Sequence, residues 1–157
     1  MKHTLAFVLI LLAACSTATA PTPATTDSTE LDIKATALAA YNVLSGPAGR
    51  RDWDRFKDLF APGGQVIHVM PDGSVKAMTT DDFMAIAKPM LDQHGIFERP
   101  VSTRIQHDGD LATLLSAFET RHASNDTQPF QKGVDAFQLL RVNGAWKILS
   151  ITRTTNP

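Results

Sequence analysis

The chain has 157 residues, of which 43% are hydrophobic and 20% are charged, a composition typical of one globular domain. Its formal net charge of −1 excludes the basic surface that would attract nucleic acid, so no nucleic-acid partner is expected. The single cysteine excludes a disulfide framework and a cysteine-based metal site, so the hydrophobic core has to stabilise the fold.

A basic start and a short apolar run, residues 5–14, precede Cys15 at the N-terminus. The run is too short to span a bilayer, which requires about 20 apolar residues. Small residues stand directly before the cysteine, in the order Leu12-Ala13-Ala14-Cys15. This order resembles the lipobox of bacterial lipoprotein signals, in which the cysteine becomes the first mature residue and carries acyl chains.

The resemblance implies a signal peptide at residues 1–14 and a membrane anchor on Cys15. Ser16 follows the cysteine. In Gram-negative lipoproteins a residue other than aspartate at this position implies the outer membrane, with the domain facing the periplasm. The alternative is a secreted protein cleaved after Ala20, although Pro21 suits the position after such a cut poorly.

The segment after the cysteine, STATAPTPATTDST, is small, polar and proline-bearing. It buries too little apolar area to offset its ordering entropy, so it is expected to be a flexible tether. The predicted organisation is therefore a signal peptide at residues 1–14, a lipidated cysteine and tether at residues 15–29, and one domain at residues 30–157.

Three helices are predicted in the first half of the domain. The first begins with a capping-box-like Thr29 and Asp32 and ends at Gly46-Pro47. Its apolar residues recur at helical spacing, with Tyr41 beside them. These apolar residues are Ile33, Ala37, Ala40 and Leu44.

The second helix is short, and the third has a clear apolar stripe. Asp52 caps the second helix, which is expected to run through Phe60 and to end at Pro62-Gly63-Gly64. Thr79 and Asp82 start the third helix, which Pro89 is expected to bend or end. The apolar stripe of the third helix consists of Phe83, Ile86, Ala87 and Met90.

Most of the remaining chain has the pattern of β-strands. A strand pair, Gln65–Met70 and Val75–Met78, is expected between the second and third helices. Glycine-bearing turns, Asp108-Gly109 and Asn143-Gly144, favour hairpins in the second half of the chain. We therefore expect four sequential antiparallel strands, at residues 97–106, 110–123, 131–142 and 145–154.

This order of elements resembles the NTF2-like, or SnoaL-like, cone fold. The resemblance rests on Ala40-Tyr41, on Trp53 to Phe60 running into a strand, and on the closing hairpin at Arg141 to Ile148. It implies an α+β fold with three N-terminal helices packed on a strongly curved, mainly antiparallel mixed sheet. The superfamily includes isomerases, dehydratases, hydrolases and proteins without catalysis, so the fold alone does not identify a function.

The resemblance places two residues at catalytic positions of the ketosteroid isomerases of this superfamily and a third near another. Tyr41 takes the place of a tyrosine that donates a hydrogen bond to an oxyanion, and His68 takes the place of the general base. Asp135 lies about two residues from the second oxyanion acid. An imidazole with a pKa of about 6.5 accepts protons near neutral pH. The alternative interpretation is structural, with the Tyr41 hydroxyl at the rim, His68 hydrogen-bonded and Asp135 solvated.

Further residues are predicted to line the conical pocket, although large apolar residues are more often core. Glu119 and Arg121 share one face of a strand. With Arg153 they would form an acid and an anion clamp in the pocket, or else they form an ion pair on an exposed face. The predicted pocket lining comprises Trp53, Phe56, Phe118, Glu119, Phe137, Ile151 and Arg153.

No metal or cofactor is expected, because the histidines lack metal-ligand spacing and Gly63-Gly64 lacks the lysine of a phosphate loop. The leading hypothesis is an accessory module that binds a small apolar ligand or a protein partner. A cofactor-free isomerase, dehydratase or hydrolase that uses Tyr41 and His68 is the first alternative. The second is a structural homodimer, paired through the sheet face, whose cone is filled by side chains.

Overall fold

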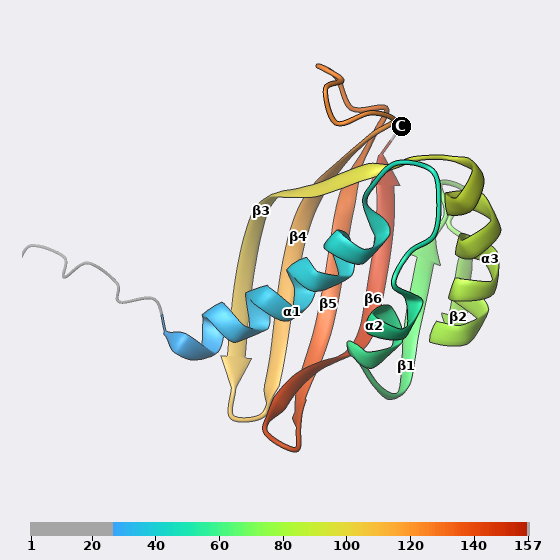
Figure 1. The fold of residues 1–157 in the computed structure, drawn as a ribbon. Helices are drawn as coiled ribbons and strands as arrows, with labels where there is room; N and C mark the ends of the chain where they lie inside the picture. The colour runs from blue at the N-terminus through green and yellow to red at the C-terminus, as the bar shows by residue number, and fades with distance from the viewer. Residues whose placement is uncertain (1–26, 157) are drawn as a thin grey trace, which may run out of the picture.

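Three helices lie against one face of a curved six-stranded sheet in the computed structural model, which describes residues 27–156 (Figure 1). Helix α1, Ser28–Leu44, crosses three strands of the second half of the chain, whereas the third helix lies beside the first two strands. The α+β class predicted from the sequence is confirmed. The predicted lipobox, the signal peptide and the tether up to residue 26 lie outside the described residues.

Helix α1 begins earlier than the capping pattern predicted. The Asp27 side chain accepts a hydrogen bond from the backbone nitrogen of Thr29 at 3.0 Å, so Asp27 is the N-cap. The predicted start at Thr29 and Asp32 is wrong because an aspartate two residues upstream satisfies the free amide groups of the first turn. The predicted apolar face of this helix is buried as expected.

Helix α2, Trp53–Asp58, is capped by Asp52 as predicted, with 3.0 Å between the carboxylate and the amide of Arg55. The predicted continuation of this helix through Phe60 is wrong. Strand β1, Phe60–Val69, begins there, because Phe60 pairs with Ile148 of β6, Ala145–Asn156. The chain passes Pro62-Gly63-Gly64 inside this strand through a register irregularity, with Gly63 at a φ of 79°.

Strand β2, Val75–Thr79, leads directly into helix α3, Thr80–Gln93. The predicted capping box is confirmed, because the Thr79 hydroxyl and the Asp82 carboxylate each accept a hydrogen bond from the other's backbone amide. Pro89 lies inside the helix and does not end it. Of the predicted apolar stripe, Ala87 is buried, whereas Ile86 and Met90 remain 51% and 47% exposed.

The sheet has the strand order β2-β1-β6-β5-β4-β3. The last four strands pair sequentially and antiparallel, as predicted, and β1 joins β6 in parallel, so the sheet is mixed. At Asn143-Gly144 both residues have positive φ, 50° and 81°, as a type I′ turn requires. These four strands are β3, Phe97–Asp108; β4, Leu111–Arg121; β5, Gln131–Val142; and β6, Ala145–Asn156.

The two faces of the sheet differ in burial. Residues of the inner face, such as Leu114, Phe118 and Phe137, are at most 1% exposed under the helices. Residues of the outer face, such as Leu115 and Val134, are 41% and 39% exposed. The alternation follows from the two-residue period of a strand.

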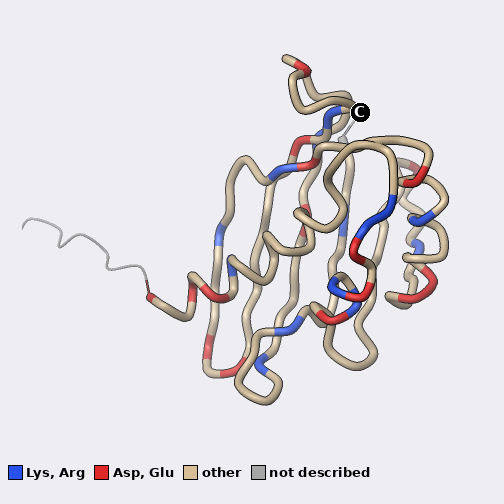
Figure 2. Tube along the Cα trace, in the orientation of Figure 1, with Lys and Arg blue, Asp and Glu red and all other residues tan. Residues whose placement is uncertain are grey.

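Acidic and basic residues are interspersed over the described chain rather than separated into two regions (Figure 2). Over residues 27–156, no helix is both long and apolar enough to cross a membrane.

Candidate functional site

Three charged or titratable residues lie in one row across the inner face of the sheet. His68 on β1 is the register partner of Arg153 on β6, and Arg153 is the partner of Asp135 on β5. Register partners on neighbouring strands project to the same face. The pairing therefore brings together side chains that are 85 residues apart in the sequence.

The Arg153 guanidinium lies between two buried carboxylates. Its Nε and one Nη donate to the two oxygens of Asp135 at 2.8 and 2.7 Å. The same Nη and the other Nη donate to Glu98 at 2.7 and 3.0 Å. Both carboxylate side chains are 1% exposed, whereas that of Arg153 is 19% exposed. Burial alone would lower the pKa of Arg153, but the hydrogen bonds and charges of Asp135 and Glu98 hold it above the usual value.

Two hydroxyl groups complete this buried network. The Tyr41 hydroxyl donates to Asp135 at 2.7 Å, and the Thr120 hydroxyl donates to Glu98 at 2.9 Å. Tyr41 is 3% exposed and Asp135 is fully buried. The structural alternative that placed the Tyr41 hydroxyl at a rim and Asp135 in solvent is therefore wrong in both positions.

Tyr41 is expected to stay protonated in the folded protein well above pH 10. Burial, and then the negative charge of Asp135, raise the pKa of its hydroxyl. Tyr41 is the single tyrosine of the chain, so absorbance at the phenolate band reports this residue alone. Because the folded pKa exceeds the unfolded one, this group's contribution to stability is lost as pH rises above about 10.

We therefore expect the phenolate signal to appear together with loss of the circular dichroism signal in an alkaline titration. Phenolate formation near pH 10 in a fully folded protein would contradict the buried hydrogen bond.

A cavity of about 450 Å³ opens beside this network, between α3 and the strands β1, β2 and β6. Its inner wall includes three polar side chains, His68, Glu98 and Arg153. Its outer wall is apolar and flexible in shape, because methionine side chains adapt to irregular ligands. Exposed or half-buried apolar residues of this wall include Met70, Phe83, Ile86, Met90 and Phe130.

His68 is half-buried in the wall of this cavity, with its ring centroid 6.3 Å from that of Phe83. Among the described residues, no hydrogen bond holds the imidazole. Burial, and then the positive charge of Arg153, lower the pKa of His68 below 6.5. The imidazole is therefore neutral at pH 7 and offers one acceptor and one donor nitrogen.

The neutral state of His68 predicts a one-sided dependence of stability on pH. Because the folded pKa is lower than the unfolded one, the unfolded chain binds this proton first, and stability falls as pH drops below about 6.5. Proton NMR titration should give a midpoint below 6.5 for the His68 resonance, which is identified by its absence from His68→Gln. A midpoint for His68 above 6.5 would contradict this assignment.

Most of the predicted pocket lining lies elsewhere in the fold. Of the residues predicted to line a pocket, Arg153 lies in the wall of this cavity. Four of the apolar residues, Phe56, Phe118, Phe137 and Ile151, are core residues at 0% to 6% exposure, and Trp53 packs against that core. They are covered by the helices, which sequence periodicity alone did not distinguish from a cavity wall.

Glu119 lies on the opposite face of the sheet from the cavity. Its carboxylate is 2.9 Å from Arg121, 3.3 Å from Arg99 and 3.6 Å from Lys132. Glu119 and Arg121 therefore form the ion pair of the alternative interpretation, although their side chains are only 17% and 13% exposed rather than on an exposed face. The predicted acid and anion clamp in the pocket is wrong for these two residues. Strand parity separates them from Arg153.

Sequence reasoning missed Glu98 and Thr120, which complete the network. They are register partners on β3 and β4, and both are buried. A glutamate at an inward position of a strand is a signal that a charged partner lies opposite. That signal requires the parity of β3 to be known, and the register irregularity between Pro100 and Ser102 obscures it.

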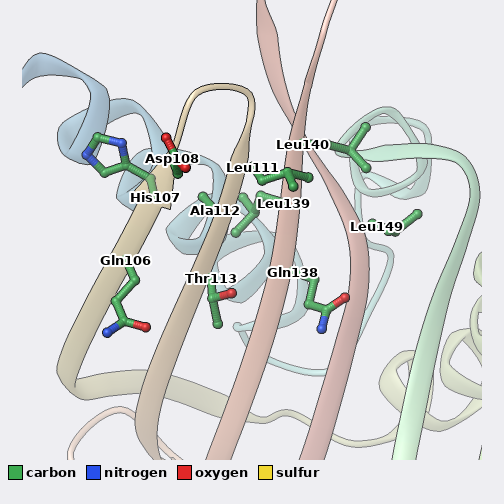
Figure 3. A pocket seen from close by; sticks show the side chains of 10 residues that line it. All are labelled: Gln106, His107, Asp108, Leu111, Ala112, Thr113, Gln138, Leu139, Leu140 and Leu149. Atoms are coloured by element: carbon green, nitrogen blue, oxygen red, sulfur yellow. The ribbon is translucent and has the colours of Figure 1, made fainter.

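A second depression, of about 400 Å³, lies at the other end of the sheet (Figure 3). It is formed by the ends of β3, β4, β5 and β6 and contains none of the predicted site residues. Its His107 is 3.5 Å from Asp27 at the start of α1. Within residues 27–156, no group of three or more histidine, cysteine or acidic side chains is placed to hold a metal ion.

Comparisons with solved structures show the same fold in bacterial proteins of low sequence identity. A protein of the NTF2-like family from Streptomyces avermitilis, provisionally assigned as a dehydratase, is 16% identical with a TM-score of 0.66, covering 85% of this chain and 99% of that one. A protein from Novosphingobium aromaticivorans, provisionally assigned as a scytalone dehydratase, is 15% identical with a TM-score of 0.64, covering 82% and 85%.

A third structure, a protein of unknown function with a cystatin-like fold from Nostoc punctiforme, is 18% identical with a TM-score of 0.65, covering 82% of this chain and 91% of that one. No curated protein matches the chain. The model of the SnoaL-like domain family matches residues 35–152. This range includes most of α1, the strands as far as residue 152, and Tyr41, Glu98, Thr120 and Asp135 of the network, whereas Arg153 lies one residue beyond it. The chain therefore belongs to the SnoaL-like domain family and has the NTF2-like fold predicted from its sequence.

Proposed function

We propose that this domain binds a small, largely apolar molecule in the cavity beside α3. The observation that carries the proposal is the cavity itself, about 450 Å³ in volume, with apolar walls and a few polar groups at its inner end. Ligand sites in proteins have this combination of size and lining. The alternative of a filled cone predicts that no such space remains, so the cavity argues against it.

Ile86 allows this proposal to be tested without disturbing the core. Its side chain is 51% exposed and lines the cavity, so Ile86→Glu should fold normally while placing a charge on the apolar wall. Leu31 on α1 is 55% exposed and lies away from the cavity, so Leu31→Glu is a matched control.

We expect the neutral dye N-phenyl-1-naphthylamine to bind the wild type and Leu31→Glu equally and Ile86→Glu at least about tenfold more weakly. Equal binding to all three proteins would overturn the proposal. If the dye binds as expected, native mass spectrometry of the purified protein would identify a molecule that it carries from its cell.

His68 supports a second candidate function, a cofactor-free lyase or isomerase. Its imidazole is neutral at pH 7, lines the cavity and has no protein hydrogen-bond partner among the described residues, which are properties of a general base. Tyr41 and Asp135 lie behind Arg153 and are absent from the cavity wall, so in this proposal they position Arg153 rather than touch a substrate. A reaction that His68→Gln abolishes, while dye binding persists, would favour this candidate.

We further propose that Cys15 anchors the domain to the outer membrane, because Leu12-Ala13-Ala14-Cys15 matches the lipobox and no other cysteine competes. Cys15→Ser should release the domain from membranes or leave the signal uncleaved. Metabolic labelling with a palmitate analogue should mark the wild type only. Equal labelling of both proteins would contradict the proposal.

The outer face of the sheet is proposed as a homodimer surface. Leu111, Leu115, Val134 and Leu149 are each at least 37% exposed on β4, β5 and β6. Light scattering of the wild type and of Leu115→Lys should then give a dimer and a monomer, respectively. A monomeric wild type would overturn this part of the proposal.

A further inference from the structure

The free hydrogen-bonding capacity of Arg153 restricts the kind of molecule that the cavity can accept. A guanidinium has five N–H donors. Four of them are used by Asp135 and Glu98, in two forked pairs. One N–H on Nη therefore has no protein partner among the described residues.

The charge around this donor is not positive. Arg153 contributes one positive charge and its two carboxylate partners contribute two negative charges. Both carboxylates also accept hydroxyl hydrogen bonds, from Tyr41 and Thr120, as ionised carboxylates do. Tight binding of a carboxylate or phosphate requires two parallel N–H donors and a compensating positive charge. At the inner end of the cavity such an anion would meet a cluster of net negative charge and a single free donor.

The other polar groups at this end point to the same chemistry. His68 is half-buried and presents an uncharged imidazole, and the side chain of Glu98 is 1% exposed and satisfied by its own partners. Lys76 also lines the cavity, but it is exposed at the mouth, on the edge strand β2. It is the cation that an acid could reach without entering the inner end.

We infer that the ligand is a neutral molecule with one carbonyl or hydroxyl oxygen, which accepts a hydrogen bond from the free N–H of Arg153. This inference rests on the proposed function. An apolar skeleton fills the rest of the cavity. Carboxylates of the same size are excluded from the inner end by Glu98 and Asp135. Glu98 and Asp135 are thus specificity-determining residues, because they occupy the guanidinium that would otherwise hold an anion.

The test compares rigid molecules of nearly the same shape, 2-acetylnaphthalene, 2-naphthoate and 2-ethylnaphthalene, on the wild-type protein by fluorescence titration. We expect the ketone to bind at least about tenfold more tightly than the carboxylate, because a buried like-charge contact is strongly unfavourable. The hydrocarbon should bind about three- to tenfold more weakly than the ketone, because it leaves the guanidinium donor unpaired. These measurements do not depend on any variant folding.

A change of charge at Glu98 provides a second, independent part of the test. Glu98→Gln makes the cluster neutral and keeps an acceptor for Arg153, so the ratio of naphthoate affinity to ketone affinity should rise at least about tenfold. Glu119→Gln, on the outer face, is the matched control and should change neither affinity. Lys76→Gln separates an acid held at the mouth from one held at the inner end.

Naphthoate binding as tight as ketone binding, and unaffected by Lys76→Gln, would overturn the inference while leaving the binding function intact. Ketone and hydrocarbon binding of equal strength would overturn the role of the Arg153 donor. Failure of all three molecules and of the neutral dye to bind would instead overturn the proposed function.

Discussion

Replacing Arg153 with leucine should lower the free energy of unfolding by about 3–5 kcal/mol, the largest effect expected from a single substitution in this domain. The substitution leaves the carboxylates of Glu98 and Asp135 buried at 1% exposure without their shared cation. Removing one partner of a buried ion network is costly because the remaining charges keep their desolvation penalty. Urea unfolding at pH 7, followed by circular dichroism, measures the loss.

Two comparisons separate this charge effect from a simple loss of packing against Phe118, whose ring centroid lies 4.2 Å from the guanidinium. Adding Glu98→Gln and Asp135→Asn to Arg153→Leu removes both stranded charges and should restore most of the lost stability. Acidification should also stabilise the single variant relative to the wild type, because protons neutralise the carboxylates. Arg99→Leu should cost little, because that side chain is 63% exposed on the outer face. No recovery in the triple variant would assign the loss to packing alone.

The local signals in the sequence predicted the elements well, whereas the site depends on pairing between distant strands. Caps such as Asp52 and Thr79 and the turn at Asn143-Gly144 act within a few residues, so their outcome follows from the sequence nearby. The early start of β1 at Phe60 does not follow from the sequence nearby, because it depends on a paired partner in β6, near residue 148.

The candidate site shows the same division. Tyr41, His68 and Asp135 were selected by resemblance to catalytic positions, and the structure does place all three on the inner side of the sheet. Which of them meets the cavity depends on Arg153, whose side chain covers Asp135 and Tyr41 and leaves His68 open. No spacing in the sequence shows that a guanidinium lies between them, since Arg153 and its two carboxylates lie on three different strands.

Because Arg153 covers it, Tyr41 is expected to affect stability rather than ligand affinity. If Tyr41 touched a ligand, Tyr41→Phe would alter affinity and leave stability unchanged. Because its hydroxyl instead donates to the buried Asp135 at 2.7 Å, the structure places its main role in holding the network. The residue thus belongs to the support of the site, whereas His68 belongs to its surface.

Gly133 is the second position at which a large loss of stability is expected. Its lack of a side chain leaves room for the ring of Phe118, which contacts the Arg153 guanidinium. A Cβ atom at Gly133 would lie 2.7 Å from the ring of Phe118 and 2.1 Å from the carbonyl oxygen of Thr154. Neither contact is sterically allowed, and the carbonyl belongs to the paired strand β6. Gly133→Ala should therefore cost about 2–3 kcal/mol through overpacking, and it should also displace Phe118 from beneath the guanidinium.

The strand itself offers the control for Gly133→Ala. Val134, the next residue, projects to the outer face and is 39% exposed, so Val134→Ala should change stability only slightly. If Phe118 is displaced, Gly133→Ala should also weaken binding of 2-acetylnaphthalene, because the free donor of Arg153 moves with the ring. An alanine variant with wild-type stability and wild-type ketone affinity would show that β5 and β6 can separate at this point. The close approach of Phe118 and Thr154 would then not be what positions Arg153.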